Sequence, residues 1–183
     1  MALWTLICAL IALCALVAVS FNELVVARNR ARTAFSDIDV ELQRRHDLVP
    51  QLAAVVKGYA QHEQATLEAV AGLRVRAQAA ASIAERGALE TELGGRVANL
   101  LALEERYPEL KASANFLALE RDLVGVEDRL QDARRRYNAA VQRYNTMIER
   151  FPASLLARAF ALRALDFFAA DGDAAAAPDL SRA

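Results

Sequence analysis

The feature that most constrains this chain is an apolar stretch at its N-terminus, from Ala2 to Phe21, which contains no charged residue. A helix of this length spans roughly 30 Å, which matches the hydrocarbon core of a bilayer. A cleaved signal peptide is the alternative, and Ala18-Val19-Ser20 resembles a weak cleavage site. Signal peptides have a basic start and a shorter apolar stretch, so residues 1–21 are predicted to form a retained transmembrane anchor.

The charges that flank this stretch predict its orientation. Arg28, Arg30 and Arg32 follow it, whereas only the terminal amine precedes it. Positively charged flanks of membrane helices tend to stay in the cytoplasm. The pattern therefore favours a single-pass protein whose N-terminus lies outside and whose body is cytoplasmic.

The rest of the chain carries the pattern of long, packed helices. It has only seven glycines and four prolines, and Ala, Leu, Arg and Glu, which dominate it, favour helices. One apolar stripe advances in steps of three and four residues: Phe116, Leu119, Leu123, Val126, Leu130, Ala133, Tyr137, Ala140, Tyr144 and Met147. Such steps keep one helix face against a partner, so an all-α coiled bundle is predicted, with Pro152 closing this helix.

A second stripe follows the anchor: Leu24, Ala31, Phe35, Ile38, Leu42, Val49, Leu52, Val56, Tyr59, Val70 and Leu73. Four polar residues interrupt it at the same spacing: Arg28, Arg45, Glu63 and Thr66. Pro50 lies inside this stretch. Either the helix kinks there, or Asp47 caps a new helix that accepts proline in its first turn.

Four segments describe the predicted organisation. They are a membrane anchor (1–21), a helical bundle (22–151), an amphipathic C-terminal helix (152–168) and a disordered tail (169–183). Inside the bundle, a shorter helix is predicted from Ala88 to Arg106. The C-terminal helix is apolar enough to pack on the bundle or touch a membrane surface, and the tail is rich in alanine and aspartate.

Two polar stripes with seven-residue spacing run beside the apolar ones. The first is Asn22, Asn29, Ser36 and Gln43, and the second is Gln131, Asn138 and Asn145. They are either two solvated edges or a pair of facing rows that fixes helix register, as buried amides do in coiled coils. In the second case the first and last long helices are antiparallel, with Asn29 level with Asn145, Ser36 with Asn138 and Gln43 with Gln131.

A set of short motifs also follows in order along residues 22–168. They are Asn22-Glu23-Leu24-Val25, Arg28-Asn29, Phe35-Ser36-Asp37-Ile38-Asp39-Val40, Arg44-Arg45-His46-Asp47-Leu48-Val49-Pro50, Lys57-Gly58-Tyr59-Ala60, His62-Glu63, Tyr107-Pro108-Glu109-Leu110-Lys111-Ala112, Asn115-Phe116, Tyr137-Asn138, Tyr144-Asn145 and Phe151-Pro152. As an ordered set, these motifs resemble the LemA family. The stretch from Arg158 to Asp166 departs from that family because it lacks the expected glycines.

The resemblance implies an anchor that starts outside the cell and an up-and-down bundle of four helices in the bacterial plasma (inner) membrane. Such a bundle favours the turn at Pro50 over the kink. The family has no established molecular activity. Some relatives are linked to membrane-organelle biogenesis, and others are encoded near membrane metalloproteases.

Catalytic and metal-binding patterns are not expected. His62-Glu63 lacks a second histidine four residues after the first, because that position is Thr66. Asp37 and Asp39 point to different sides of a helix, so ion pairing is expected of them rather than acid-base chemistry. No cofactor is predicted, and a net charge of −1 gives no reason to expect a nucleic-acid partner.

The predicted function is that of a membrane-anchored scaffold or adaptor without enzyme activity. Its partners would be the lipid bilayer and either other proteins or further copies of itself. Two alternatives are a membrane-remodelling module that binds lipid surfaces and a regulator of a membrane-bound metalloprotease.

Overall fold

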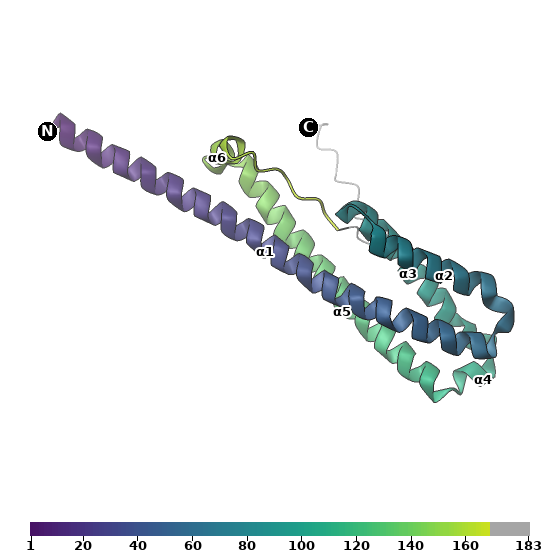
Figure 1. The fold of residues 1–183 in the computed structure, drawn as a ribbon. Coiled ribbons are helices and arrows are strands. Elements are labelled where there is room, and N and C mark those ends of the chain that lie inside the picture. The colour runs from purple at the N-terminus through teal and green to yellow at the C-terminus, as the bar shows by residue number, and fades with distance from the viewer. Residues whose placement is uncertain (169–183) are drawn as a thin grey trace, which may run out of the picture. The chain divides into compact units, whose positions relative to one another are not determined.

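The computed structural model describes residues 1–168, and these form helices without a β-strand (Figure 1). The elements are α1 (Ala2–Tyr59), η1 (Gln61–Glu63), α2 (Gln64–Ala79), α3 (Ile83–Leu101), η2 (Ala102–Glu105), α4 (Pro108–Lys111), α5 (Ala114–Glu149) and α6 (Ala153–Ala159). The prediction of an all-α fold is confirmed. The predicted disordered tail, 169–183, lies outside the described residues.

The described residues form two compact units. Unit 1 contains Met1–Ser36 and Arg135–Asp166, and unit 2 contains Asp37–Arg134 together with Phe167 and Phe168. The long helices α1 and α5 each contribute residues to both units.

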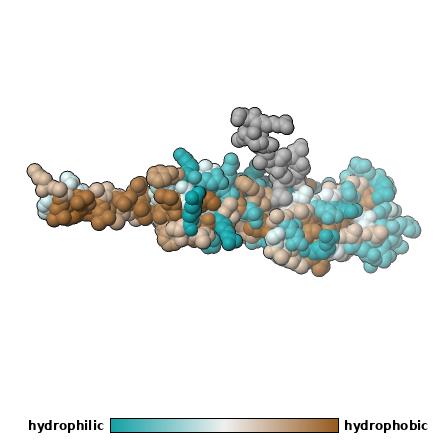
Figure 2. All heavy atoms as spheres, turned by 90° about the horizontal axis from the view of Figure 1, so that it is seen from above, coloured by the Kyte–Doolittle hydropathy of each residue, from teal (hydrophilic) through white to brown (hydrophobic). Residues whose placement is uncertain are grey.

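The N-terminal part of α1 is long and apolar enough to cross a membrane. Its side chains from Met1 to Val19 are exposed within the chain, and Figure 2 shows this segment as mostly hydrophobic. Because so much apolar surface is unfavourable in water, this exposure is compatible with a membrane anchor.

The same helix continues through Pro50, so the predicted turn at Asp47 is wrong. Proline lacks the N–H that would bond the carbonyl four residues earlier, which is that of His46. Arg74 on α2 replaces this donor, because its Nε donates to the His46 oxygen at 2.8 Å. The first turn of the bundle comes instead after Tyr59, where α1 ends.

Unit 2 is an up-and-down arrangement of four helices: the C-terminal part of α1, then α2, α3 and the N-terminal part of α5. Arg86 and Glu90 of α3 contact Asp39 and Arg45 of α1, respectively, so these two helices run parallel. Arg45 also contacts Glu127, while the earlier Glu41 contacts the later Arg129, so α5 runs antiparallel to α1. A shared apolar core fills the space between the helices: Val49, Leu52, Val56, Ala60, Val70, Leu73, Ala77, Leu89, Leu93, Val97, Leu100, Leu103, Leu110, Phe116 and Leu123.

Helix α3 begins five residues before the predicted start at Ala88, because Ser82 caps it. The Ser82 hydroxyl accepts from the Glu85 N–H at 3.1 Å, and the Glu85 carboxylate accepts from the Ala81 N–H at 3.1 Å. A serine followed three residues later by glutamate is the signature of a capping box. The helix then ends at Leu101 in a short 3-10 turn rather than at Arg106.

Unit 1 packs the N-terminal part of α1 against the C-terminal part of α5 in antiparallel orientation. The ring of Phe35 lies 5.4 Å from that of Tyr137, while the earlier Phe21 lies 4.8 Å from Phe160, beyond the end of α5. The predicted antiparallel packing is confirmed. Every residue of the apolar stripe predicted on α5 is buried or half-buried in its own unit.

The C-terminal helix is much shorter than the predicted span of 152–168, because α6 ends at Ala159. Leu162 N–H donates to the Ala157 oxygen at 2.8 Å and Ala161 N–H to the Arg158 oxygen at 3.2 Å, which form the two bonds of a Schellman cap. Ala161 adopts a φ of 51° at the position where glycine is common. The chain beyond this cap is not helical up to Phe168.

Candidate functional site

One arginine occupies a core position of unit 2. Arg45 interrupts the apolar stripe of α1, and its side chain is only 2% exposed. Its Nη1 donates to Oε2 of Glu127 on α5 at 3.1 Å. Its Nη2 donates to the backbone oxygen of Glu90 on α3 at 3.0 Å and also to the Glu90 carboxylate. A single side chain therefore joins three of the four helices.

Glu90 is the acidic centre of this cluster and is fully buried. One of its carboxylate oxygens lies 2.8 Å from Nε2 of His46, which is also buried. Burial raises the pKa of Glu90, but the contact with His46 and the charge of Arg45 outweigh burial, so its pKa is lowered from the ordinary value. Glu90 is therefore a carboxylate inside the bundle at neutral pH.

A buried ion cluster of this kind constrains structure more than it adds net stability. Transfer of an ion out of water costs several kcal/mol, which the attraction between the partners and their hydrogen bonds offset. If one partner is removed, the other charge remains buried, at a cost of about 3–5 kcal/mol. We therefore expect the cluster of Arg45, His46, Glu90 and Glu127 to fix which parts of α1, α3 and α5 lie level with one another.

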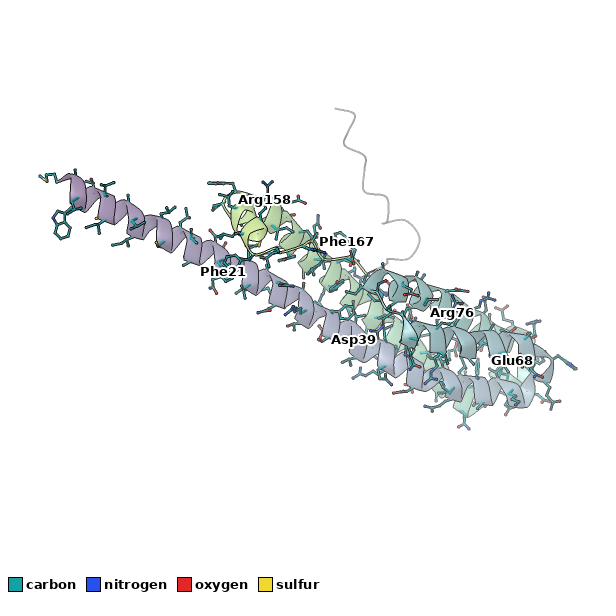
Figure 3. All side chains as sticks on the ribbon, turned by 45° about the horizontal axis from the view of Figure 1, so that its top comes forward. Phe21, Asp39, Glu68, Arg76, Arg158 and Phe167 are labelled. Atoms are coloured by element: carbon teal, nitrogen blue, oxygen red, sulfur yellow. The ribbon has the colours of Figure 1, made fainter. Side chains whose placement is uncertain are left out.

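Ion pairs nearer the surface follow the same alignment. Glu41 on α1 accepts from Arg129 Nε on α5 at 3.0 Å and from Arg44 at 2.8 Å. Arg86 on α3 lies 2.7 Å from Asp39, which Figure 3 labels on α1. Asp39 is thus an ion-pair partner, as predicted. Partly exposed pairs contribute about 0–1 kcal/mol each, so they supplement the buried cluster.

A groove of about 480 Å³ lies between α3 and α5, with Arg45 among its lining residues. Its apolar lining consists of Val97, Ala98, Leu101, Leu123 and Val124. Two glycines of α3 keep it open. A Cβ added at Gly94 would lie 3.1 Å from Nη1 of Arg45, and one added at Gly95 would meet no atom within 4 Å. The groove can therefore accept apolar side chains beside a charged floor.

The predicted pairing of two polar stripes is wrong. All four residues of the first stripe are exposed: Asn22, Asn29, Ser36 and Gln43. The Ser36 hydroxyl donates to the Arg32 oxygen, and the Gln43 amide donates to Asp47, so both bond within their own helix. The three residues of the second stripe are half-buried: Gln131, Asn138 and Asn145. The exposure of the first stripe fits the alternative, in which it is a solvated edge of the helix.

Asn145 instead holds the C-terminal segment of unit 1. Its amide nitrogen donates to the Leu165 oxygen at 3.0 Å, and its amide oxygen accepts from the Leu165 N–H at 2.9 Å. Tyr137 adds a hydroxyl hydrogen bond to the Asp166 oxygen at 2.8 Å. Burial, followed by the charge of Asp166, raises the pKa of Tyr137. Two residues of α5 thus satisfy backbone groups that the end of α6 leaves without helical partners.

The cluster around Arg45 was not predicted from the sequence, although the sequence contains a signal for it. Arg45 interrupts an otherwise apolar stripe, and a charged residue at such a position requires a buried partner. Periodicity could not identify Glu90 as that partner, because nothing in the sequence of α3 shows which residue faces α1. Arg134 is a second buried arginine of this unit, because it is 2% exposed and its guanidinium carbon lies 5.3 Å from the centre of the Phe168 ring.

The comparison with known families agrees with the short motifs found along the chain. The sequence model of the LemA family matches residues 34–181, which is most of the chain. This range includes Arg45, His46 and Glu90 and both walls of the groove. No curated protein matches the chain. Since the family match covers far more than half of its length, this protein belongs to the LemA family.

Proposed function

We propose that this protein is a membrane-anchored adaptor without catalytic activity, whose unit 2 binds an apolar segment of another protein in the groove between α3 and α5. The observation that carries the proposal is the groove itself. Its lining includes Val124, an apolar residue that is 51% exposed. At protein interfaces, anchor side chains commonly fill concave apolar pockets. Without a partner, the apolar surface of such a pocket is exposed to water.

The occupant that we propose is a protein segment rather than a charged small molecule. The terminal nitrogens of Arg45 already bond Glu90 and Glu127, so this arginine has little to offer an anion. The remaining lining is mostly apolar along two helices. Such a surface suits a row of apolar side chains from a helix or an extended strand.

The proposed location is the bacterial plasma membrane, with the N-terminus outside and the chain after residue 21 on the cytoplasmic side. The apolar part of α1 supports a single span, and Arg28, Arg30 and Arg32 support this orientation. The anchor would keep the groove close to membrane-bound partners. It would also raise the effective concentration of such partners near the groove.

Site-specific photo-crosslinking of the full-length protein in membranes tests the groove. A photo-reactive residue replaces Val124 in one variant and Val75 in another, because both valines are exposed, at 51% and 60%. Val75 lies on α2, outside the groove. We expect a discrete protein adduct from position 124 and none from position 75.

A pair of glycine variants provides the matched control. Gly95→Leu fills the groove, whereas Gly72→Leu adds the same side chain on α2, and a Cβ at either glycine meets no atom within 4 Å. The adduct at position 124 should disappear with Gly95→Leu and persist with Gly72→Leu. An adduct that survives Gly95→Leu, no adduct at all, or an adduct made of two copies of this chain would each overturn the proposed occupant.

A further inference from the structure

Unit 1 exposes a cluster of apolar side chains around α6. Phe151 is 79% exposed, Leu155 58% and Phe160 59%. The Phe160 ring also contacts Phe21, with the ring centres 4.8 Å apart. Three large apolar residues in a segment of ten are unusual on a surface that faces only water.

The contact with Phe21 places this cluster at the end of the membrane-spanning stretch. Phe21 is the last residue of the uncharged run, and Glu23 is the first charged residue after it. If the run crosses the bilayer, as the proposed function requires, Phe21 lies where the hydrocarbon core meets the headgroups. Phe160 then lies at the same depth, because its ring packs directly against Phe21.

Hydrogen bonds to the segment that follows α6 fix the position of this helix. The Schellman cap turns the chain at Ala161, and both backbone groups of Leu165 then bond the amide of Asn145. Tyr137 holds the next residue through its carbonyl oxygen. The cluster is therefore presented by a fixed element of unit 1.

Beside the apolar cluster lies a hollow of about 410 Å³ that contains two arginines. Arg158 and Arg163 line it together with Ser154 and one carboxylate, that of Glu149. No ion pair joins either arginine to another residue in the described part of unit 1. Figure 3 shows Arg158 on α6 and Phe21 on α1 in the same part of unit 1.

We propose that α6 is a second membrane-binding element, in which Phe151, Leu155 and Phe160 enter the bilayer interface and the hollow at Arg158 and Arg163 binds the phosphate of an anionic phospholipid. Aromatic residues favour this depth, and arginine keeps its charged group at the headgroups while its stem lies along apolar surface. Anionic lipids attract basic residues that lie near the membrane surface. The inference rests on the proposed membrane span of α1.

Fluorescence quenching by brominated lipids tests this inference on the full-length protein in phospholipid vesicles. Trp4 is the only native tryptophan, and it reports insertion of the anchor. A Trp4→Phe/Leu155→Trp variant moves the probe to α6, and a Trp4→Phe/Val75→Trp variant moves it to α2 as the control. We expect bromine near the headgroups to quench the probe on α6 strongly and the probe on α2 weakly.

The contribution of the two arginines is tested in the probe variant on α6. Arg158→Gln/Arg163→Gln should lower the quenching by roughly half or more in vesicles that contain phosphatidylglycerol, because two attractive charges are lost. In vesicles of phosphatidylcholine alone, the same change should have little effect. Arg76→Gln/Arg96→Gln is the control, since both of these arginines are exposed in unit 2.

The outcomes separate this inference from the proposed anchor. If Trp4 is quenched while the probe on α6 is not, the anchor stands and the inference fails. If Trp4 itself is not quenched, the proposed membrane span fails. If inorganic phosphate abolishes the effect of phosphatidylglycerol, the hollow binds a free anion, and the assignment to a lipid headgroup is overturned.

Discussion

The two units solve the same packing problem with different chemistry. Unit 2 fixes its helices with buried charges, because Arg45 on α1 bonds Glu90 on α3 and Glu127 on α5. Unit 1 has an aromatic contact between Phe35 and Tyr137, together with side-chain hydrogen bonds to backbone groups. The interactions in unit 2 depend on charge, whereas those in unit 1 depend on shape and on neutral hydrogen bonds.

The two units should therefore lose different amounts of stability when one of these side chains is replaced. A buried charge that loses its partner cannot be hydrated, so damage in unit 2 is large. A backbone amide that loses a side-chain partner at a partly exposed site can bond to water, so damage in unit 1 is smaller and local.

Removal of the Glu90 charge should cause the largest loss. Glu90→Gln leaves Arg45 buried beside a neutral partner, so the free energy of unfolding should fall by about 3–5 kcal/mol. Chemical denaturation measures the change. Glu92→Gln on the same helix is the control, because this side chain is 50% exposed and should matter by less than about 0.5 kcal/mol. Equal losses would show that the buried cluster carries no special weight.

The wild-type protein and the Glu90→Gln variant should differ in how their stability depends on pH. The lowered pKa of Glu90 means that its stabilisation is present above the carboxyl pKa of the unfolded chain and is lost as pH falls through the lower folded-state value. Denaturation curves of the wild-type protein should show this loss at acidic pH. Glu90→Gln should lack that component, whereas a wild-type stability that rises on acidification would contradict the assignment.

Truncation of the apolar core comes next. Leu130 is fully buried in unit 2, so Leu130→Ala should cost about 2–5 kcal/mol through lost burial and the cavity left behind. Arg135→Ala, on an exposed face of the same helix, should change stability by within about 0.5 kcal/mol. Thermal denaturation would distinguish them, and similar shifts for both would mean that the stripe on α5 faces another way.

The bond from Arg74 to the His46 carbonyl predicts a conditional effect. Arg74→Met removes the donor that replaces the missing N–H of Pro50, at a cost of about 1–3 kcal/mol. In a Pro50→Ala background, the alanine N–H can bond the His46 oxygen, so the same change should cost much less. A double-mutant cycle measures this coupling, and strictly additive effects would contradict it.

The smallest effect is expected in unit 1. Asn145→Ala removes both hydrogen bonds to Leu165, which should cost about 1 kcal/mol and speed hydrogen exchange at the Leu165 amide. Asn29→Ala, on the exposed stripe of α1, is the comparison and should leave that amide unchanged. If both variants speed exchange equally, Asn145 does not hold the C-terminal segment.

Apolar periodicity in the sequence was sufficient to predict the last long helix, whereas its antiparallel packing was predicted from the polar stripes and from the family resemblance. The stripe from Phe116 to Met147 lies on one continuous helix, and its residues are buried or half-buried. The turn at Pro50 was favoured over a kink because the family resemblance implied a bundle of four helices. Helix α1 continues through Pro50 instead, because Arg74, which is distant in sequence, replaces the missing donor. The end of α6 was missed because an alanine, Ala161, adopts a backbone conformation that normally signals glycine.

The candidate site was less predictable than the fold. The interruption of the apolar stripe at Arg45 was visible, but its partners lie 45 and 82 positions away along the chain. Only tertiary packing brings these residues together. For the polar stripes, in contrast, the sequence suggested contacts that the structure does not show. Their regular spacing suggested a pairing, but residues such as Asn29 lie on the exposed face.

A double-mutant cycle on Arg45 and Glu90 measures whether this buried ion pair holds α1 and α3 together. If the two charges act as a buried unit, Arg45→Met and Glu90→Met should each lower the free energy of unfolding by about 3–5 kcal/mol. The double variant, with two apolar side chains in place of the pair, should lose less than either single variant. Losses that simply add would contradict the claim that this ion pair holds α1 and α3 together.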